Sequence, residues 1–299
     1  TQPIAIDGTI VSPSGPFDLA VVDFDDNLIY RAAHLIPRAQ LRHSGPASTL
    51  DGGFVVASGF AGAANFGCGP HDAGPADQTW YLGRFDSAMG CVRSTPLAKG
   101  TVNDSFWITD VYSDRSGNII IGGAISGTVY VLGSPVSGAS SPGVFNSVVM
   151  SINQEDQLQW VSVVAPNAGA GHAVNPGANW LAVAASGQQL IATFATNRSG
   201  FDFQGSIVDA ACAHPIDPGA DSLGLGVLLL DGGIPLWATC WNSEGAGRGP
   251  GVYPKAIRAL PQGGFVLLTG NSAGGEFAGH ATGTSDGGTS EVAQVTWVD

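Results

Sequence analysis

Charged residues, basic ones above all, are scarce in this sequence, and long apolar runs are missing. Only 12% of the 299 residues are charged, and 11 Lys or Arg stand against 24 Asp or Glu, which gives a formal net charge of −13. A nucleic-acid-binding face needs clustered Lys and Arg. No apolar run approaches the roughly 20 residues of a membrane-spanning helix. We therefore expect neither a nucleic-acid partner nor a membrane span.

Sequence signatures of common catalytic sites are also missing. The chain contains no Gly-x-Ser-x-Gly, no His-Glu-x-x-His, no phosphate-binding glycine loop followed by Lys and no EF-hand spacing. Most carboxylates lie at polar corners, where Asp is expected for turn chemistry. The sequence favours a non-enzymatic protein and indicates no cofactor.

What the chain does contain is many short apolar runs separated by turn residues, with 44 Gly and 18 Pro. The clearest group lies at 106–112, 119–123, 148–152 and 158–164, where β-branched and aromatic residues alternate with polar corners. Such a pattern predicts four antiparallel strands joined by turns. A sheet of this size cannot bury its own faces alone.

The same pattern recurs along the chain. A glycine-ended strand, the strand that follows it and an outer strand recur at roughly 65 to 75 residues, which is typical of a β-propeller. We predict an all-β protein, a β-propeller of about five four-stranded antiparallel blades with irregular first and last blades. The five units are expected at about 1–36, 37–100, 101–166, 167–245 and 246–299, within one domain.

The two ends of the chain do not match a simple closed ring. Asp7-Gly8-Thr9 resembles Ser126-Gly127-Thr128, so the first residues are interpreted as the tail of a second strand. Residues 292–299 match a third strand. Three alternatives stay open: irregular terminal blades, residues 4–11 serving as the outer edge of the last unit, or pairing with another chain, because an open edge is a pairing template. The candidate pairing positions are Ile4, Ile6, Ile10, Val292, Val295 and Trp297.

Loop lengths give a further hint. Connections between first and second strands and between third and fourth strands are short, whereas those between second and third strands, and between units, are long. In an up-and-down sheet the short connections lie at one end of the strands and the long connections at the other. Binding residues are expected on the side with long loops.

The four cysteines fall into two pairs at matching places in the repeat. Three connectivities are possible, and the repeat favours Cys68–Cys91 and Cys212–Cys240. Disulfides indicate an oxidising compartment. The alternative is four buried free thiols.

Two loops contain histidine beside aspartate, at His71-Asp72 and at His214 with Asp217. These residue types can bind a divalent metal. Their spacing is not a known ligand pattern, and the loops are rich in Pro and Gly, so structured turns are the favoured explanation and no metal is expected.

The sequence is similar to a known family of repeats. Residues 117–129 (GNIIIGGAISGTV), 148–153 (VVMSIN) and 158–160 (LQW) resemble the SBBP-type repeat of secreted bacterial β-propellers. That resemblance implies a propeller in an exported or surface protein, and it transfers no catalytic residue. The chain departs from the family by having about five units rather than seven. Because the chain begins at Thr1, we also expect that a signal peptide has been removed.

We therefore expect an extracellular or cell-surface binding or assembly module, which polymerises through terminal strand pairing and whose partner is a protein or a glycan. The alternative is a carbohydrate-active enzyme or lectin with a pocket at the centre of the long-loop face. Such an enzyme needs paired carboxylates, and the candidates are Asp104, Asp110 and Asp202. Glycosylation patterns occur at Asn103 and Asn197.

Overall fold

The protein is all-β in the part that the structure, a computed structural model, describes. The described residues are 3–6, 9–12, 19–25, 27–36, 45–60, 63–72, 78–100, 105–138, 145–166, 182–186, 189–196, 201–203, 206–208, 224–231, 234–241, 252–260, 265–271, 276–277, 280–281 and 292–298. None of them is helical, and every strand pair among them is antiparallel. This part of the chain accordingly has no helix with the length and hydropathy to cross a membrane.

Two six-stranded sheets form the centre of the molecule. Sheet 2 has the order β14-β13-β10-β9-β6-β5, and sheet 3 has the order β11-β12-β15-β16-β19-β20. The strands of sheet 2 are β5 (Ala47–Ser48), β6 (Phe54–Phe60), β9 (Gln78–Phe85), β10 (Cys91–Gly100), β13 (Thr128–Val131) and β14 (Ser134–Ser137). The strands of sheet 3 are β11 (Ser105–Ser113), β12 (Ile119–Ser126), β15 (Asn146–Ile152), β16 (Leu158–Pro166), β19 (Phe201–Phe203) and β20 (Ser206–Val208).

Smaller sheets lie on either side of this centre. Sheet 1 is β3 (Leu19–Phe24) with β4 (Tyr30–Ile36). Sheet 4 is β17 (Ala182–Ser186), β18 (Gln189–Thr196), β21 (Gly224–Asp231) and β22 (Ile234–Trp241), and sheet 5 is β23 (Val252–Ala259), β24 (Phe265–Asn271) and β27 (Val292–Val298). Three further hairpins stand alone: β1 (Ile4–Ile6) with β2 (Thr9–Val11), β7 (Ala63–Asn65) with β8 (Pro70–Asp72), and β25 (Glu276–Phe277) with β26 (His280–Ala281).

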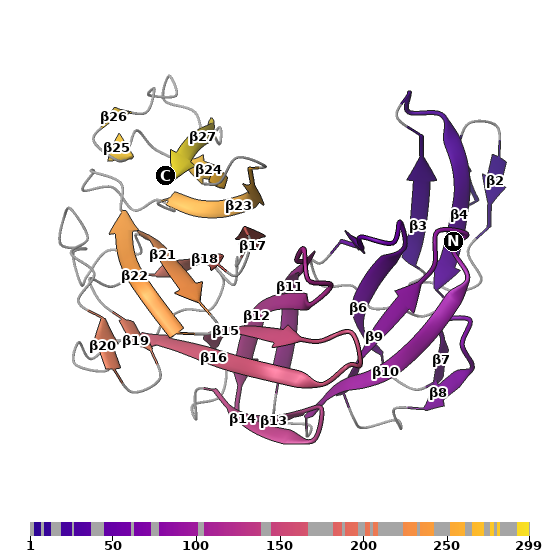
Figure 1. The fold of residues 1–299 in the computed structure, drawn as a ribbon, viewed down its shortest axis with the longest axis horizontal. Helices are drawn as coiled ribbons and strands as arrows, with labels where there is room; N and C mark the ends of the chain where they lie inside the picture. The colour runs from indigo at the N-terminus through magenta and orange to yellow at the C-terminus, as the bar shows by residue number, and fades with distance from the viewer. Residues whose placement is uncertain are drawn as a thin grey trace.

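The sheets follow one another in chain order along an open arc, with the N-terminal strands at one end and the C-terminal strands at the other (Figure 1). The first strands of sheets 2 to 5 pack against one another in succession: β11 contacts β5 and β6 on one side and β17 on the other, and β17 contacts β23. The fourth strands β10, β16 and β22 lie on the convex side of the arc (Figure 1). The prediction of short antiparallel strands in repeated sheets is confirmed.

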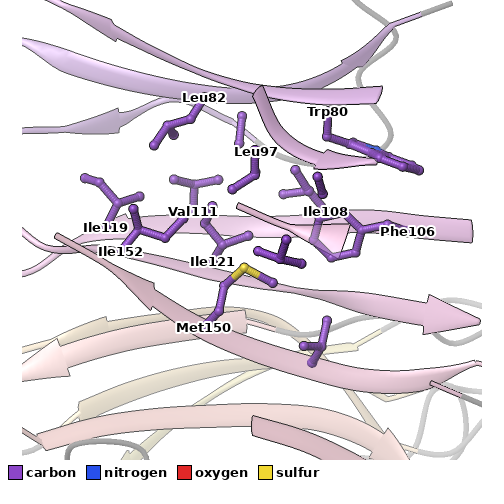
Figure 2. Close-up of a cluster of buried hydrophobic side chains, with 14 of the residues drawn as sticks. Trp80, Leu82, Leu97, Phe106, Ile108, Val111, Ile119, Ile121, Met150 and Ile152 are labelled. Atoms are coloured by element: carbon purple, nitrogen blue, oxygen red, sulfur yellow. The ribbon is translucent and has the colours of Figure 1, made fainter. Parts of the chain in front are cut away.

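The main hydrophobic core lies between sheets 2 and 3 (Figure 2). Every residue of β12 is buried, since this strand is covered on both faces, and a strand covered in that way has a continuous apolar sequence. Complete burial of one isoleucine side chain stabilises the folded state by about 1.5–3 kcal/mol. Trp80 belongs to this core, in edge contact with Phe106 at 5.3 Å between ring centroids. The largest members are Trp80, Leu82, Leu97, Phe106, Ile108, Ile119, Ile121, Ile125, Met150 and Ile152.

Five short turns share one hydrogen-bond pattern. In each, the first residue's N–H donates to the fifth residue's carbonyl and the fourth residue's N–H donates to the first residue's carbonyl, at 2.9–3.1 Å. The fourth residue has a φ of 60 to 81°. The turns are 25–29, 49–53, 86–90, 114–118 and 153–157. All of them lie at first-to-second or third-to-fourth connections, as the sequence predicts.

Aspartate and asparagine side chains stabilise these turns. The Oδ1 atoms of Asp25, Asp86, Asp114 and Asn153 each accept hydrogen bonds from the N–H groups two and four residues later, at 2.8–3.1 Å. The interpretation as turn residues is therefore confirmed for Asp25, Asp51 and Asp114. It is wrong for the Asp156 side chain, which binds arginines of another strand pair.

Candidate functional site

Two of the long connections between second and third strands contain short hairpins that join one sheet to the next. β13 follows β12 of sheet 3 in sequence but pairs with β10 of sheet 2, with Ala98 opposite Val131 and Lys99 opposite Tyr130. β19 lies between β18 and β21 of sheet 4 in sequence and pairs with β16 of sheet 3. The described hairpins of these two connections fasten neighbouring sheets by backbone hydrogen bonds.

The same kind of hairpin occurs at the N-terminus. β1 pairs with β2, with Ile6 opposite Thr9, as Val131 lies opposite Ser134 in β13–β14. The interpretation of residues 4–11 as the tail of a second strand is therefore wrong. Asp7-Gly8-Thr9 corresponds to Leu132-Gly133-Ser134, and not to Ser126-Gly127-Thr128.

A sequence signal for these hairpins exists, and it is short. Two residues ending in glycine lie between the paired positions in four of the five hairpins: Asp7-Gly8, Leu132-Gly133, Gln204-Gly205 and Ala278-Gly279. At Leu132 and Gly133 φ is 47° and 84°, and a two-residue turn of this kind requires positive φ at both positions. The pattern is easily missed because the flanking strands have only two to four residues.

The two candidate pairing edges lie far apart in the molecule. Ile4 and Ile6 occupy register positions equivalent to Val129 and Val131, which are fully buried in β13. Among the described strands, β1–β2 pairs with no strand outside its own hairpin, and Ile10 is 69% exposed.

Val292, Val295 and Trp297 all lie on β27, which pairs with β24 and with no other described strand. The N-terminal hairpin and β27 lie at opposite ends of the arc (Figure 1). Closure of the last sheet by residues 4–11 of the same chain is therefore not what the structure shows.

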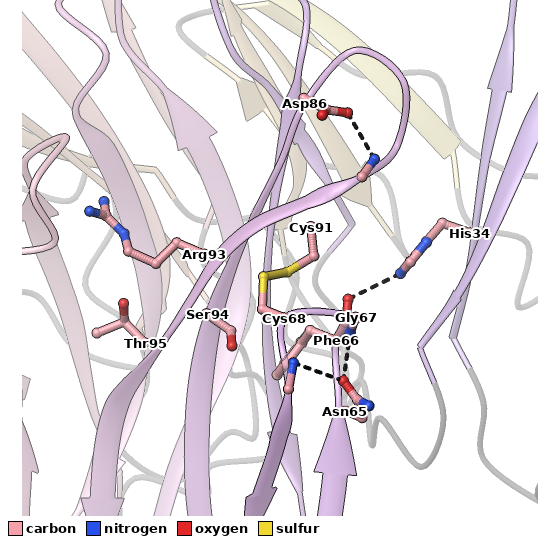
Figure 3. Close-up of a disulfide and its surroundings, with 12 residues drawn as sticks. His34, Asn65, Phe66, Gly67, Cys68, Asp86, Cys91, Arg93, Ser94 and Thr95 are labelled. Carbon is pink, nitrogen blue, oxygen red and sulfur yellow. Dashed lines mark hydrogen bonds between the residues drawn. A yellow bond between two sulfur atoms is a disulfide. The ribbon is translucent and has the colours of Figure 1, made fainter.

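A disulfide joins Cys68 to Cys91, with a Cα–Cα distance of 5.3 Å (Figure 3). This prediction is confirmed. Cys68 lies in the loop of hairpin β7–β8, and Cys91 is the first residue of β10. Of the second predicted pair, Cys212 lies outside the described residues and only the backbone of Cys240, in β22, is described. The pairing Cys212–Cys240 stays a prediction.

The loop between β7 and β8 is shaped by Asn65 and Gly67. The Asn65 Oδ1 accepts hydrogen bonds from the N–H groups of Gly67 and Gly69, at 2.8 and 3.3 Å (Figure 3). Gly67 has a φ of 97°, and a Cβ placed there would lie 3.3 Å from the Cys91 Cβ. A glycine is required at this position, for the backbone conformation and for the close approach of the two segments.

His71, in β8, contacts residues of sheet 2. Its Nε2 is hydrogen-bonded to the Ser94 hydroxyl, and its ring lies 4.4 Å from that of Tyr81. Burial lowers the pKa of His71 below the ordinary value of 6.5. A neutral imidazole packed on an aromatic ring supports a structural role for this residue.

The metal candidates are not brought together in the described part. The Asp72 backbone belongs to β8, and His214 and Asp217 lie outside the described residues. No group of three or more His, Cys, Asp and Glu residues with metal-binding geometry occurs among the residues that the structure describes.

Two of the carboxylates considered for a glycosidase, Asp110 and Asp202, do not lie side by side in the sheet. Asp110 lies on β11 and Asp202 on β19 of the same sheet, four strand spacings apart, or roughly 19 Å. Catalytic carboxylates of glycosidases lie about 5–10 Å apart. Asp104 lies outside the described residues.

One buried ionic cluster was not found by reasoning from the sequence. Asp156, in the β15–β16 turn, accepts from Arg84 Nε and Arg93 Nε, both at 2.7 Å, and from the Thr95 hydroxyl at 2.6 Å. A second nitrogen of Arg84 donates to the Asn153 carbonyl at 2.8 Å. The cluster joins sheet 2 to sheet 3, and Asp156 is more than sixty residues from its partners in sequence, so no local pattern connects them.

No model of a known protein family matches the chain, and no curated protein matches it.

Proposed function

We propose that the protein is a β-propeller of about five units, of the SBBP-type repeat class, which acts outside the cell as a non-enzymatic binding and assembly module. The succession of first strands along the inner side of the arc supports the propeller. The Cys68–Cys91 disulfide supports an oxidising compartment.

The observation that carries the assembly proposal is the repeated docking of a hairpin on an outer strand. Within the chain, β13 extends the ladder of β10, and β19 extends that of β16. The β1–β2 hairpin is built in the same way and has no such partner among the described strands, and β27 offers a seven-residue edge. The β1–β2 hairpin of one copy would pair with β27 of the next copy and would thereby extend sheet 5 of that copy.

This contact is heterologous, because two different surfaces meet. Heterologous contacts need not close and can therefore give chains of many copies. Strand addition supplies affinity through main-chain hydrogen bonds, so the partner is an extended protein segment rather than a glycan.

The test measures assembly by sedimentation velocity over a range of protein concentrations. We expect species that are multiples of the 30.3 kDa chain, and we expect the double variant Ile4→Lys/Ile6→Lys to stay monomeric, since charges on an edge discourage pairing. The matched control is Ile29→Lys, an exposed residue in the turn of sheet 1, which should assemble as the unmodified protein does. A protein that is monomeric at every concentration, or a double variant that assembles normally, contradicts the proposal.

A further inference from the structure

Sheet 1 is attached to the rest of the molecule in a different way from the other sheets. It has two strands, and among the described residues no strand of another sheet pairs with it. Sheets 2 and 3, by contrast, share the β10–β13 ladder and the Asp156 cluster. A two-stranded hairpin is marginally stable by itself, so sheet 1 depends on its side-chain contacts.

Those contacts centre on one residue of the β7–β8 loop. Phe66 is fully buried and packs in a cluster with Val21 and Ile36 of sheet 1 and with Tyr81 and Phe85 of sheet 2. The Phe66 ring thus fills the space between the two sheets. If the Phe66 ring moves out, the hydrophobic cluster between sheets 1 and 2 loses one of its buried side chains.

The backbone of the same loop holds sheet 1 as well. The Phe66 carbonyl is hydrogen-bonded to His34 Nε2 of β4 at 3.2 Å (Figure 3). The His34 ring in turn lies 4.9 Å from that of Phe85. Sheet 1 is therefore fastened both by direct contact with sheet 2 and through the loop, and the second attachment requires that the loop itself be fixed to sheet 2.

The Cys68–Cys91 disulfide fixes the loop covalently, and His71 of β8 adds contacts with Ser94 and Tyr81 of sheet 2. The disulfide bond ties the loop, two residues after Phe66, to the start of β10 (Figure 3). Gly67 lies between the two attachments, within 3.3 Å of the Cys91 Cβ and 3.6 Å of the His34 ring when a Cβ is placed on it. Unlike β13–β14 and β19–β20, hairpin β7–β8 has no ladder to a neighbouring sheet in the described part. The disulfide takes the place of that ladder.

We propose that Cys68–Cys91 is a redox latch that fastens sheet 1 to sheet 2. Oxidation closes the latch and holds Phe66 in its cluster. Reduction releases the β7–β8 loop, Phe66 leaves the cluster, and sheet 1 separates from a molecule that stays folded from β9 to β16.

The reductant is a dithiol. One of its thiolates attacks the exposed Cys68 sulfur, the bond between the two cysteines breaks, and Cys91 leaves as a thiolate. The second thiol of the reductant attacks the reductant sulfur of the mixed disulfide and releases Cys68 as a thiolate. The two cysteine thiolates take up the two protons that the dithiol loses, and the dithiol becomes a disulfide.

Hydrogen–deuterium exchange of the full chain tests this proposal. To remove the second predicted cystine, the starting protein is Cys212→Ser/Cys240→Ser, compared before and after treatment with dithiothreitol. We expect amides in β3, β4, β7 and β8 to exchange about tenfold faster or more after reduction, with β12 and β15 unchanged. Cys68→Ser/Cys91→Ser in the same background should give the reduced pattern without reductant.

A variant with the disulfide intact separates the latch from a general loss of stability. Phe66→Ala removes the side chain that the latch holds, and should accelerate exchange in β3 and β4 while Cys68–Cys91 stays formed. Unchanged exchange in β3 and β4 after reduction overturns the proposal. So does equal acceleration in β12 and β15, because the disulfide would then support the whole molecule rather than one attachment.

Discussion

Individual residues in the short turns carry backbone strain that the sequence does not reveal. The fourth turn residue has a left-handed conformation, which glycine adopts readily at Gly52 and Gly117. Leu28, Met89 and Asp156 hold the same position with φ of 60 to 64°. Each is held there by the turn's hydrogen bonds and, for Met89 and Asp156, by contacts with a neighbouring sheet.

Leu28 has no such compensation and offers a clean test. Its side chain is 81% exposed, so replacing it removes little packing. Leu28→Gly should stabilise the protein by about 0.5–1 kcal/mol in urea unfolding, because relief of left-handed strain exceeds the added freedom of the unfolded chain. The matched control is Leu50→Gly, at a 70% exposed turn residue whose φ is not in the left-handed region; it should destabilise the protein. Equal destabilisation by both variants would show that the strain is not real.

At the scale of strands and hairpins, much of the fold could be predicted, because periodicity and turn chemistry are local. The strands of sheet 3 follow β-branched runs, and the glycines within the second strands β6 and β12 have a physical cause. A Cβ at Gly123 would lie 2.2 Å from the Trp107 carbonyl, and one at Gly59 would lie 2.9 Å from the Trp80 ring. Glycine allows the neighbouring strand or ring to approach.

The hairpins between second and third strands could not be assigned in the same way. Their strands are too short to show a period of two, and their partners belong to another sheet. Nothing in the sequence indicates the ionic cluster of Asp156, because an aspartate in a turn is expected to accept hydrogen bonds from the backbone of that turn. Its two arginine partners are defined only once sheets 2 and 3 are packed.

Hairpin β7–β8 should make stability depend on pH through His71. Burial lowers the pKa of His71 in the folded state below 6.5, so the unfolded chain binds a proton more readily. The stabilising effect of the lower pKa is complete above about pH 6.5 and is lost as pH falls toward and through the folded-state pKa. Between about pH 8 and about pH 5, the free energy of unfolding should fall more steeply for the unmodified protein than for His71→Gln. Identical slopes for the two proteins would exclude this role for His71.

For the whole molecule, the junctions between sheets differ in kind. Sheets 2 and 3 are joined by an apolar core, a backbone ladder and a buried ionic cluster. Sheets 1 and 2 are joined by the Phe66 cluster and by the bond of His34 to the β7–β8 loop, which the disulfide ties to sheet 2. In proteins built from repeated units, stability is approximately a sum of unit and junction contributions. Loss of one junction should therefore lower the local stability of the two sheets beside it more than that of the others.

The ionic cluster is the most specific part of the junction between sheets 2 and 3. The Asp156 side chain is 3% exposed and that of Arg84 is 14% exposed, so the charge of Arg84 has little access to water when its partner is lost. Asp156→Asn preserves shape, and asparagine tolerates the left-handed conformation. The variant should lower the free energy of unfolding by about 3 kcal/mol, because it leaves a buried guanidinium without its anion.

The control for this variant is Glu155→Gln, at the exposed neighbouring position of the same turn, which should change stability by less than about 0.5 kcal/mol. Urea unfolding measures both variants, and the difference between them should persist in concentrated salt, since buried pairs are screened much less than exposed ones. Hydrogen exchange in Asp156→Asn should accelerate in β10, β13 and β16, beside the junction, more than in β23 and β24 of sheet 5. Two variants of equal stability would mean that the apolar core and the ladder hold this junction without the cluster.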